Sequence, residues 1–257
     1  MIPTVAVTRY VVPLREGGSL PGLVEAEDLG TYVCKFRGAG QGVRVLVAEV
    51  VVGELARRIG VPTPELVALE LDAEIARYEA DEEVQDLLNA SLGLNLGVDF
   101  LPGSFGYDAS CEPDPELAGR ILWLDALCAN VDRSWRNPNL LVWRGEVHAI
   151  DHGAALYFHH AWPGGPGDPA RFAHQPYDTG EHILRHYAAE ALAQDEELAA
   201  LVSEELVREV LELVPDGWLE PVPGAATPEA LRERYASYLL ARVRGARGWL
   251  PQVAVAE

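Results

Sequence analysis

The sequence predicts an α+β protein whose first third is rich in strands and whose remainder is mainly helical. Before residue 40, runs of β-branched residues alternate with short glycine-containing turns, and from residue 114 onward apolar residues recur at helical spacing. The dipeptide Pro102-Gly103 separates the two patterns. We therefore expect a first lobe over residues 1–102 and a second lobe over residues 103–257.

The first lobe is predicted to hold an antiparallel sheet. Short turns join the first three strands into a meander, and Tyr32, Cys34 and Phe36 share one face of the third strand. A helix follows and ends at Gly60, because the next prolines forbid its restart. The expected elements are strands over 4–12, 23–27, 31–37, 65–71 and 98–101, a helix over 46–59, and a short helix that Asp81 caps.

The second lobe is predicted to be mainly helical. Asp114-Pro115-Glu116 supplies an N-cap, a first-turn proline and a first-turn acid, and Thr227-Pro228-Glu229 repeats this pattern. Residues 162–169 contain too many glycines and prolines for regular structure, so we expect a loop. The further expected helices cover residues 181–194, 195–214 and 227–244.

The charge of the chain excludes several classes of function. Its 257 residues include 40 Asp and Glu against 20 Lys and Arg, a net charge of −20, so general nucleic-acid binding is excluded and an anionic membrane surface is disfavoured. The longest apolar stretch, residues 43–52, is interrupted by Arg44 and Glu49, which argues against membrane insertion. The three cysteines show no C-x-x-C spacing, which indicates a cytoplasmic protein without a zinc site.

A predicted β-hairpin gathers polar residues at one end. Two apolar runs flank a two-residue turn, at residues 140–143 and 146–150 around Arg144-Gly145. This register places Asp151 opposite Pro138, between Asn137 and Asn139. Facing residues in a ladder lie about 5 Å apart, so the hairpin brings a carboxylate close to an amide.

Asp132 lies five residues before Asn137, on the loop that leads into this hairpin. Carboxylate and amide oxygens around one point form a site for Mg²⁺, which takes its remaining ligands from water and from substrate phosphates. Phosphoryl transfer needs such a metal, together with an aspartate that orients the attacking hydroxyl. The segment therefore favours phosphate and metal chemistry over a hairpin with merely polar ends.

Four segments resemble the HipA-like kinases, which belong to the phosphatidylinositol-kinase-like branch of the protein-kinase fold. They are Asp132-Arg133-x-x-x-Asn137, Ile150-Asp151-His152-Gly153, the run from Ala48-Glu49 to Gly60-Val61-Pro62, and Tyr32-Val33-Cys34-Lys35-Phe36. The resemblance extends over about residues 10 to 160, with the parts in the family's order. It implies a two-lobed protein-kinase-like fold, with a small antiparallel β lobe that carries one helix and a mainly helical large lobe.

The resemblance implies a role for each matching residue. Lys35 contacts the ATP phosphates and pairs with Glu49, and Asp132 orients the acceptor hydroxyl or accepts its proton. Asn137 and Asp151 hold magnesium. The glycine-rich loop over the phosphates is expected at Gly17, Gly18 and Ser19, and the adenine-binding backbone at Asp99, Phe100 and Leu101.

Some positions leave alternatives open. Asn139 competes with Asn137 as the metal ligand, and the run from Gly38 to Gly42 competes with the glycines at 17 and 18. His152 stands where common protein kinases carry Phe, and Ser134 replaces the histidine usual in the lipid-kinase branch. The chain resembles a short form that lacks the extra amino-terminal subdomain of HipA toxins, so a toxin role does not carry over.

Lysine usage supports the predicted ATP site. Lys35 is the only lysine in the chain, and a lone lysine on a strand ahead of a helix with a glutamate suits a phosphate contact. Candidates for additional positive potential are Arg37, Arg44, Arg133 and Arg136.

We therefore expect an ATP- and Mg²⁺-dependent phosphotransferase that moves the γ-phosphoryl group to a hydroxyl, with protein Ser/Thr as the favoured acceptor. One alternative is a kinase that acts on a small molecule or a lipid head group, with its pocket formed by the helical lobe and residues 162–180. The other is a nucleotide-binding scaffold without catalysis.

Overall fold

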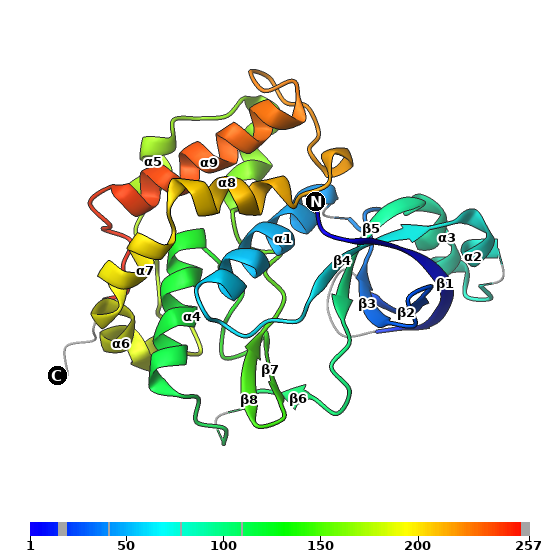
Figure 1. Ribbon diagram of the computed structural model, residues 1–257, viewed down its shortest axis with the longest axis horizontal. Helices are drawn as coiled ribbons and strands as arrows, with labels where there is room; N and C mark the ends of the chain where they lie inside the picture. Colours follow the sequence, from blue (N-terminus) through cyan, green and yellow to red (C-terminus); the bar gives the residue numbers. More distant parts are fainter. Residues whose placement is uncertain (15–19, 41, 78, 109, 253–257) are drawn as a thin grey trace. The chain divides into compact units, whose positions relative to one another are not determined.

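The computed structural model describes residues 1–14, 20–40, 42–77, 79–108 and 110–252 of the chain, which divides into two units (Figure 1). Unit 1 comprises Met1–Val47, Pro64–Pro102 and Val214–Leu219. Unit 2 comprises Ala48–Thr63, Gly103–Leu213 and Glu220–Glu257. Residues 48–63, with Glu49, group with unit 2, and residues 214–219 group with unit 1. The lobes expected over residues 1–102 and 103–257 stay a prediction.

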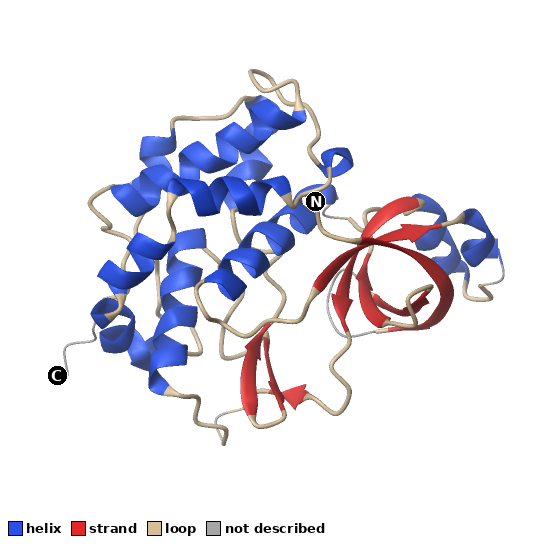
Figure 2. Cartoon of the chain, viewed as in Figure 1, coloured by secondary structure: helices blue, strands red, loops and turns tan. Residues whose placement is uncertain are grey.

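Unit 1 is built on a closed five-stranded barrel, drawn as red arrows in Figure 2. Its strands are β1 (Thr4–Pro13), β2 (Gly22–Ala26), β3 (Thr31–Lys35), β4 (Leu66–Leu71) and β5 (Gly93–Asp99), in the order β1-β2-β3-β5-β4. The predicted antiparallel meander of β1, β2 and β3 is confirmed. Closure comes from the parallel pairing of Thr4–Ala6 with Ala68–Glu70, which the sequence did not predict.

The barrel core follows the alternation of β3. Tyr32, Cys34 and Phe36, which were predicted to share one face, are all buried and join Val24 and Leu69 in one apolar cluster. Two helices, α2 (Ala73–Arg77) and α3 (Glu82–Ala90), also belong to this unit, with Val84 and Leu88 of α3 in the same cluster. The predicted cap is confirmed, since the Asp81 carboxylate accepts the Glu83 N–H at 3.1 Å, whereas α2 was missed.

Strand β5 begins five residues before the predicted strand over 98–101. Asn95 and Gly97 obscure its pattern, because both residue types are depleted in strands. Asn95 is fully buried, and backbone groups satisfy its amide: Nδ2 donates to Ser91 O at 2.7 Å and to Gly93 O at 2.9 Å, and Oδ1 accepts the Arg37 N–H at 2.9 Å. The burial of this polar side chain is tolerated because the three hydrogen bonds satisfy its amide group.

Unit 2 is mainly helical. Helix α1 (Val43–Arg58) enters it at Ala48, and the other α-helices are α4 (Pro115–Cys128), α5 (Pro169–Ala173), α6 (Ala188–Ala193), α7 (Asp195–Leu201), α8 (Glu204–Glu212) and α9 (Pro228–Arg244). The caps predicted for α4 and α9 are confirmed, since Asp114 accepts the Leu117 N–H at 3.0 Å and Thr227 accepts the Ala230 N–H at 3.3 Å. Among the described residues, no helix is long and apolar enough to cross a bilayer.

Three helix and loop boundaries in unit 2 differ from the predictions. The helix over 195–214 is two helices, because Ser203 caps α8 by accepting the Leu206 N–H at 3.1 Å. The helix over 181–194 is regular only in α6, which the 3-10 turn η2 (Arg185–Tyr187) precedes. The segment predicted as a loop at 162–169 contains the end of the 3-10 helix η1 (Tyr157–Gly164) and the start of α5.

The predicted hairpin is confirmed. Strands β7 (Leu140–Trp143) and β8 (Glu146–Ala149) pair with Trp143 opposite Glu146, the register that a two-residue turn requires. A short strand β6 (Phe105–Gly106), not predicted, adds to β7. The hairpin thus carries residue 151 to the same end as the loop before β7.

Candidate active site

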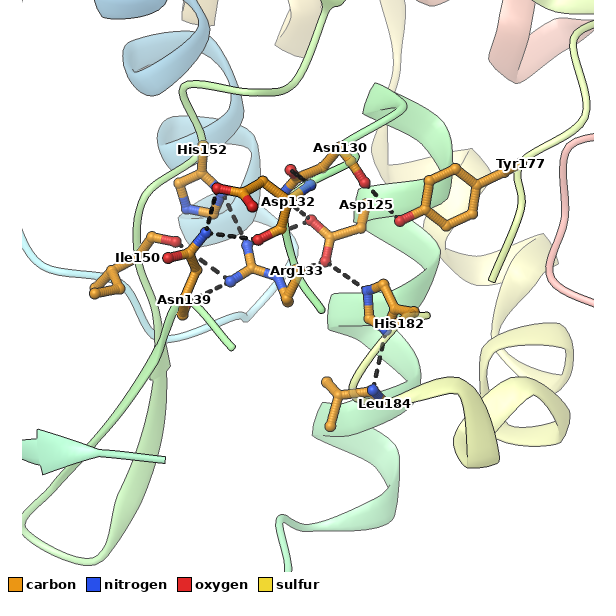
Figure 3. Close-up of polar contacts among 10 residues, drawn as sticks. All are labelled: Asp125, Asn130, Asp132, Arg133, Asn139, Ile150, His152, Tyr177, His182 and Leu184. Carbon is orange, nitrogen blue, oxygen red and sulfur yellow. Dashed lines mark hydrogen bonds and ion pairs between the residues drawn. The ribbon is translucent and has the colours of Figure 1, made fainter. Parts of the chain in front are cut away.

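The carboxylate of Asp125 forms a buried centre at the carboxyl end of α4 (Figure 3). Oδ2 accepts from Arg133 Nε at 2.5 Å and from His182 Nε2 at 3.0 Å, and Oδ1 accepts from Asn130 Nδ2 at 2.9 Å. His182 Nδ1 accepts the Leu184 N–H at 3.0 Å, so the ring proton lies on Nε2 and points at the carboxylate. We call Asp125, Asn130, Arg133 and His182 the Asp125 centre.

The environment of Asp125 favours its ionised form. Burial on its own raises the pKa of this carboxyl, but the Arg133 charge and the His182 hydrogen bond outweigh burial and hold the pKa below its usual range. Arg133 is itself fully buried, and the pair is a closed internal ion pair. Arg133 therefore does not supply the exposed positive potential that the sequence suggested for it.

The guanidinium of Arg133 also reaches the hairpin. Nη1 donates to the backbone carbonyls of Asn139 and of Ile150, the latter at 3.3 Å. Nη2 lies 3.3 Å from Asp125 Oδ1 and 3.3 Å from His152 Nδ1. Since the Ile150 N–H donates to Asn139 O at 3.0 Å, one side chain binds both strands where the hairpin ends.

Asp132, Asn137 and Asn139 meet on the loop before β7. Asn137 Nδ2 donates to Asp132 Oδ2 at 2.9 Å, and Asn139 Nδ2 donates to Asp132 O at 2.7 Å and to Oδ2 at 3.3 Å. The Asp132 N–H donates to Asn130 Oδ1 at 3.1 Å, which joins this loop to the Asp125 centre. The structure thus brings together three of the residues that the sequence singled out.

The backbone around Asp151 is held on both sides. On one side Arg133 binds the Ile150 carbonyl, and on the other the His152 N–H donates to Glu49 Oε2 at 3.0 Å. Asp151 adopts a left-handed conformation with φ +53°, and its side chain is exposed. The buried side chains of Arg133 and Glu49 therefore fix the backbone on either side of Asp151, whose carboxylate is exposed.

The contact of Glu49 with His152 was not predicted. A glutamate only 2% exposed needs a partner, and this backbone N–H provides one. The predicted pairing of Glu49 with Lys35 joins residues of different units and stays a prediction.

The chemistry of these side chains fits a divalent cation. The amide nitrogens of Asn137 and Asn139 are turned to Asp132, and within the described residues neither Oδ1 accepts a hydrogen bond. Asp151 offers an exposed carboxylate from the adjoining strand end. Amide and carboxylate oxygens are the ligands that Mg²⁺ takes in proteins, and either asparagine meets this requirement.

Residues predicted to bind phosphate lie in unit 1. Lys35 is the half-buried last residue of β3, opposite Leu96 of β5. The glycine loop expected at Gly17, Gly18 and Ser19 lies outside the described residues. In the competing run, the Gly38 N–H donates to Ser91 Oγ at 3.1 Å, and a Cβ on Gly38 would lie 2.7 Å from Ala90 O, so packing alone explains this glycine.

The segment predicted to bind adenine follows β5. The Asp99 N–H donates to Glu65 O at 2.9 Å and the Phe100 N–H to Thr31 O at 3.0 Å, so both donors are used within unit 1. Burial, reinforced by neighbouring carboxylates, raises the pKa of Asp99. An adenine contact here would thus use carbonyl groups or the backbone of Leu101.

A cavity of about 340 Å³ lies beside the loop before β7 in unit 2. It includes Val131, Arg133 and Ser134, which flank Asp132 in the chain. Tyr177 forms part of its wall and donates through its hydroxyl to Asn130 O at 2.6 Å. The segment 175–178, from the region that the sequence assigned to an acceptor pocket, lines this cavity.

Sequence reasoning missed three members of the Asp125 centre, namely Asp125, Asn130 and His182. Asp125 is an acid inside the apolar run Ile-Leu-Trp-Leu-Asp-Ala-Leu-Cys, and a lone acid in such a run needs a partner. His182 gives no comparable signal, because its role comes from a contact 57 residues away in the chain.

Comparisons with known proteins identify the family and the fold of the chain. The sequence model of the HipA-like kinase family matches residues 7–250, and no curated protein sequence matches the chain. Among solved structures, the Helicobacter pylori proinflammatory kinase CtkA is similar with a TM-score of 0.52 at 11% identity, covering 90% of this chain and 93% of that one. A Golgi casein kinase with Mn/ADP bound gives a TM-score of 0.42 at 14% identity, covering 96% and 74%. The predicted α+β kinase-like fold is confirmed.

Proposed function

Because the chain belongs to the HipA-like kinase family, we propose that it transfers the γ-phosphoryl group of ATP to a hydroxyl group, with a protein serine or threonine as the acceptor. The observation that carries this proposal is the cluster of Asp132, Asn137 and Asn139 beside the strand end that presents Asp151. Family membership implies a phosphotransferase that uses ATP and a divalent cation, and the assignment of residues to roles is our proposal.

Asp132 is proposed to act on the acceptor. Its Oδ2 accepts from Asn137, which fixes the carboxylate, while its Oδ1 accepts no hydrogen bond from the described residues and faces the acceptor hydroxyl in this proposal. The acceptor oxygen forms a bond to the γ-phosphorus as the bond to the β–γ bridging oxygen breaks. The hydroxyl proton passes to Asp132, and ADP leaves.

Other residues are proposed to hold the nucleotide. Asn137 or Asn139, together with Asp151, would hold Mg²⁺, which offsets negative charge on the phosphates. Lys35 would contact the phosphates and pair with Glu49. The backbone near Asp99–Leu101 would bind adenine, and one of the two glycine segments, 17–19 or 38–42, would cover the phosphates.

A small-molecule acceptor is the second candidate, and the cavity beside the loop favours it. Its volume of about 340 Å³ falls within the range of pockets for small ligands, which begins near 300 Å³. Val131 and Ser134 line it and lie within two residues of Asp132 in the chain, which would bring a bound hydroxyl close to the proposed base. Finding a phosphorylated metabolite instead of a phosphoprotein would select this candidate.

Transfer is tested with γ-labelled ATP and Mg²⁺, with the protein alone and with cell extract. We expect wild-type protein to label an acceptor and Asp132→Asn to label it about 10²–10⁴-fold more slowly, because the amide cannot take the proton. Asp108→Asn, a matched change at an exposed acid of unit 2, should keep the wild-type rate. Equal labelling by wild type and Asp132→Asn would contradict the proposal.

Nucleotide binding is tested without an acceptor. An ATP acyl-phosphate probe transfers its acyl group to a nearby lysine amine, and Lys35 is the only lysine of the chain. We expect peptide mapping to find the acyl group on Lys35, with protection by excess ATP and Mg²⁺. Labelling without phosphoryl transfer in any assay would instead identify a nucleotide-binding scaffold.

A further inference from the structure

The guanidinium of Arg133 binds backbone carbonyls in addition to the Asp125 carboxylate that it neutralises. Nε and Nη2 engage the two oxygens of Asp125, while Nη1 bridges the carbonyls of Asn139 and Ile150. The guanidinium is planar with donors at fixed angles, so these contacts set the position of the two carbonyls relative to helix α4.

The two carbonyls belong to residues next to proposed metal ligands. Asn139 is itself one candidate, and Ile150 immediately precedes Asp151. The backbone of Asn139 and that of Asp151 are both left-handed, with φ +48° and +53°, a conformation that asparagine and aspartate tolerate best after glycine. Arg133 touches the chain at both points.

We infer that Arg133 is a positioning residue for the divalent cation: anchored on Asp125, it fixes the separation of the asparagine loop and Asp151 at which the two can share one ion. This inference rests on the proposed function. Groups that orient metal ligands typically change metal affinity by 10- to 100-fold when they are replaced.

The competing interpretation is that Arg133 only neutralises Asp125. Arg133→Lys separates the two, because an ammonium group preserves the charge pair but cannot reach a carboxylate and two carbonyls in one plane. Arg242→Lys is a matched control, since Arg242 is also fully buried in unit 2 and binds backbone carbonyls, those of Ala126, Phe172 and Gln175.

The test measures Mn²⁺ binding by electron paramagnetic resonance in the presence of a non-hydrolysable ATP analogue. We expect Arg133→Lys to raise the apparent Kd for Mn²⁺ by about 10- to 100-fold and Arg242→Lys to leave it within about twofold of wild type. Equal effects of the two substitutions, with tight binding by wild type, would overturn this inference and leave the proposed function standing. A wild-type protein that binds no Mn²⁺–nucleotide would overturn the proposed function, and this inference with it.

A second variant guards against the case in which Arg133→Lys prevents folding. Asp125→Asn/Arg133→Met removes both charges, so no unpaired ion is buried, yet it also removes the bridge to the carbonyls. A folded double variant whose apparent Kd rises by the same factor supports positioning. A folded double variant with the wild-type Kd identifies Arg133 as a counter-ion alone and refutes the inference.

Discussion

Two fully buried arginines of unit 2 have opposite surroundings. Arg133 faces the Asp125 carboxylate at 2.5 Å, whereas Arg242 on α9 binds only carbonyl oxygens among the described residues and lies against aromatic rings, with its guanidinium carbon 4.4 Å from the Phe172 ring centre and 5.3 Å from that of Trp249. Burial lowers the pKa of Arg242 to about 10. Arg133 thus forms an ion pair, whereas Arg242 connects helices by hydrogen bonds to their carbonyl groups.

This difference separates two uses of the same side chain. Arg242 ties α9 to the Ala126 carbonyl of α4, to the Phe172 carbonyl of α5 and to the Gln175 carbonyl just after α5, so its contacts join packed helices. Arg133 ties α4 to a loop and a strand end that carry exposed polar groups. Loss of Arg242 should therefore affect packing, and loss of Arg133 should affect both packing and the site.

The largest expected effect is on the free energy of unfolding. Arg133→Met leaves the Asp125 carboxylate buried without its main counter-charge and should cost about 3–5 kcal/mol. Arg242→Met removes a buried cation that has no carboxylate partner among the described residues and leaves carbonyls unpaired, which should cost about 1–3 kcal/mol. Urea unfolding measures both. A larger decrease in unfolding free energy for Arg242→Met than for Arg133→Met would contradict the distinction drawn between the two arginines.

The second expected effect is on how the free energy of unfolding changes with pH under acidic conditions. Because the folded state lowers the pKa of Asp125, its contribution is fully present above the unfolded value, about 3.9, and is lost as the pH falls through the lower folded value. In that window Asp125→Asn should reduce the slope of unfolding free energy against pH by about 1.4 kcal/mol per pH unit.

Arg242→Lys is the control for this pH dependence and should keep the wild-type slope below about pH 4, because it does not alter the carboxylate. Urea unfolding between about pH 2 and pH 5 supplies the measurement. An unchanged slope in Asp125→Asn would show that other carboxyl groups carry the acid sensitivity.

The smallest expected effect comes from Tyr177, which contacts the Asp125 centre through Asn130, and it tests whether the positioning network extends beyond that centre. Tyr177→Phe removes the hydrogen bond to Asn130 O, leaves the ion pair intact and should cost about 1 kcal/mol of unfolding free energy. Mn²⁺ affinity in the presence of the nucleotide analogue should stay at the wild-type value. A weakened affinity would extend the positioning network to the wall of the cavity.

The parts of the fold that could be predicted depend on local chemistry. The hairpin register followed from the two-residue turn at Arg144-Gly145, and the starts of α4 and α9 followed from Asp114 and Thr227 as caps. Barrel closure could not be predicted, because the pairing of β1 with β4 joins segments more than 60 residues apart, and such a parallel contact leaves no local pattern. Ser203, the N-cap of α8, is the kind of residue from which a break between α7 and α8 can be predicted.

The candidate site divides in the same way. Asp132, Asn137 and Asp151 could be found because their spacing in the chain matches a family motif and a hairpin. The groups that hold them in place act through backbone carbonyls and N–H groups, as Arg133 and Glu49 do, and such contacts are invisible in a pattern of side-chain types. A buried acid such as Asp125 is the clue that sequence reading can still use.

Closure of the barrel through Thr4–Ala6 has a practical consequence. These three residues pair with the edge of β4 at Ala68–Glu70. Without them, the backbone N–H and C=O groups of this edge would have no strand to pair with, beside apolar side chains. An uncovered strand of that kind is a template for intermolecular pairing. Trimming the first six residues should therefore make the protein aggregate, even though every side chain assigned to catalysis would be untouched.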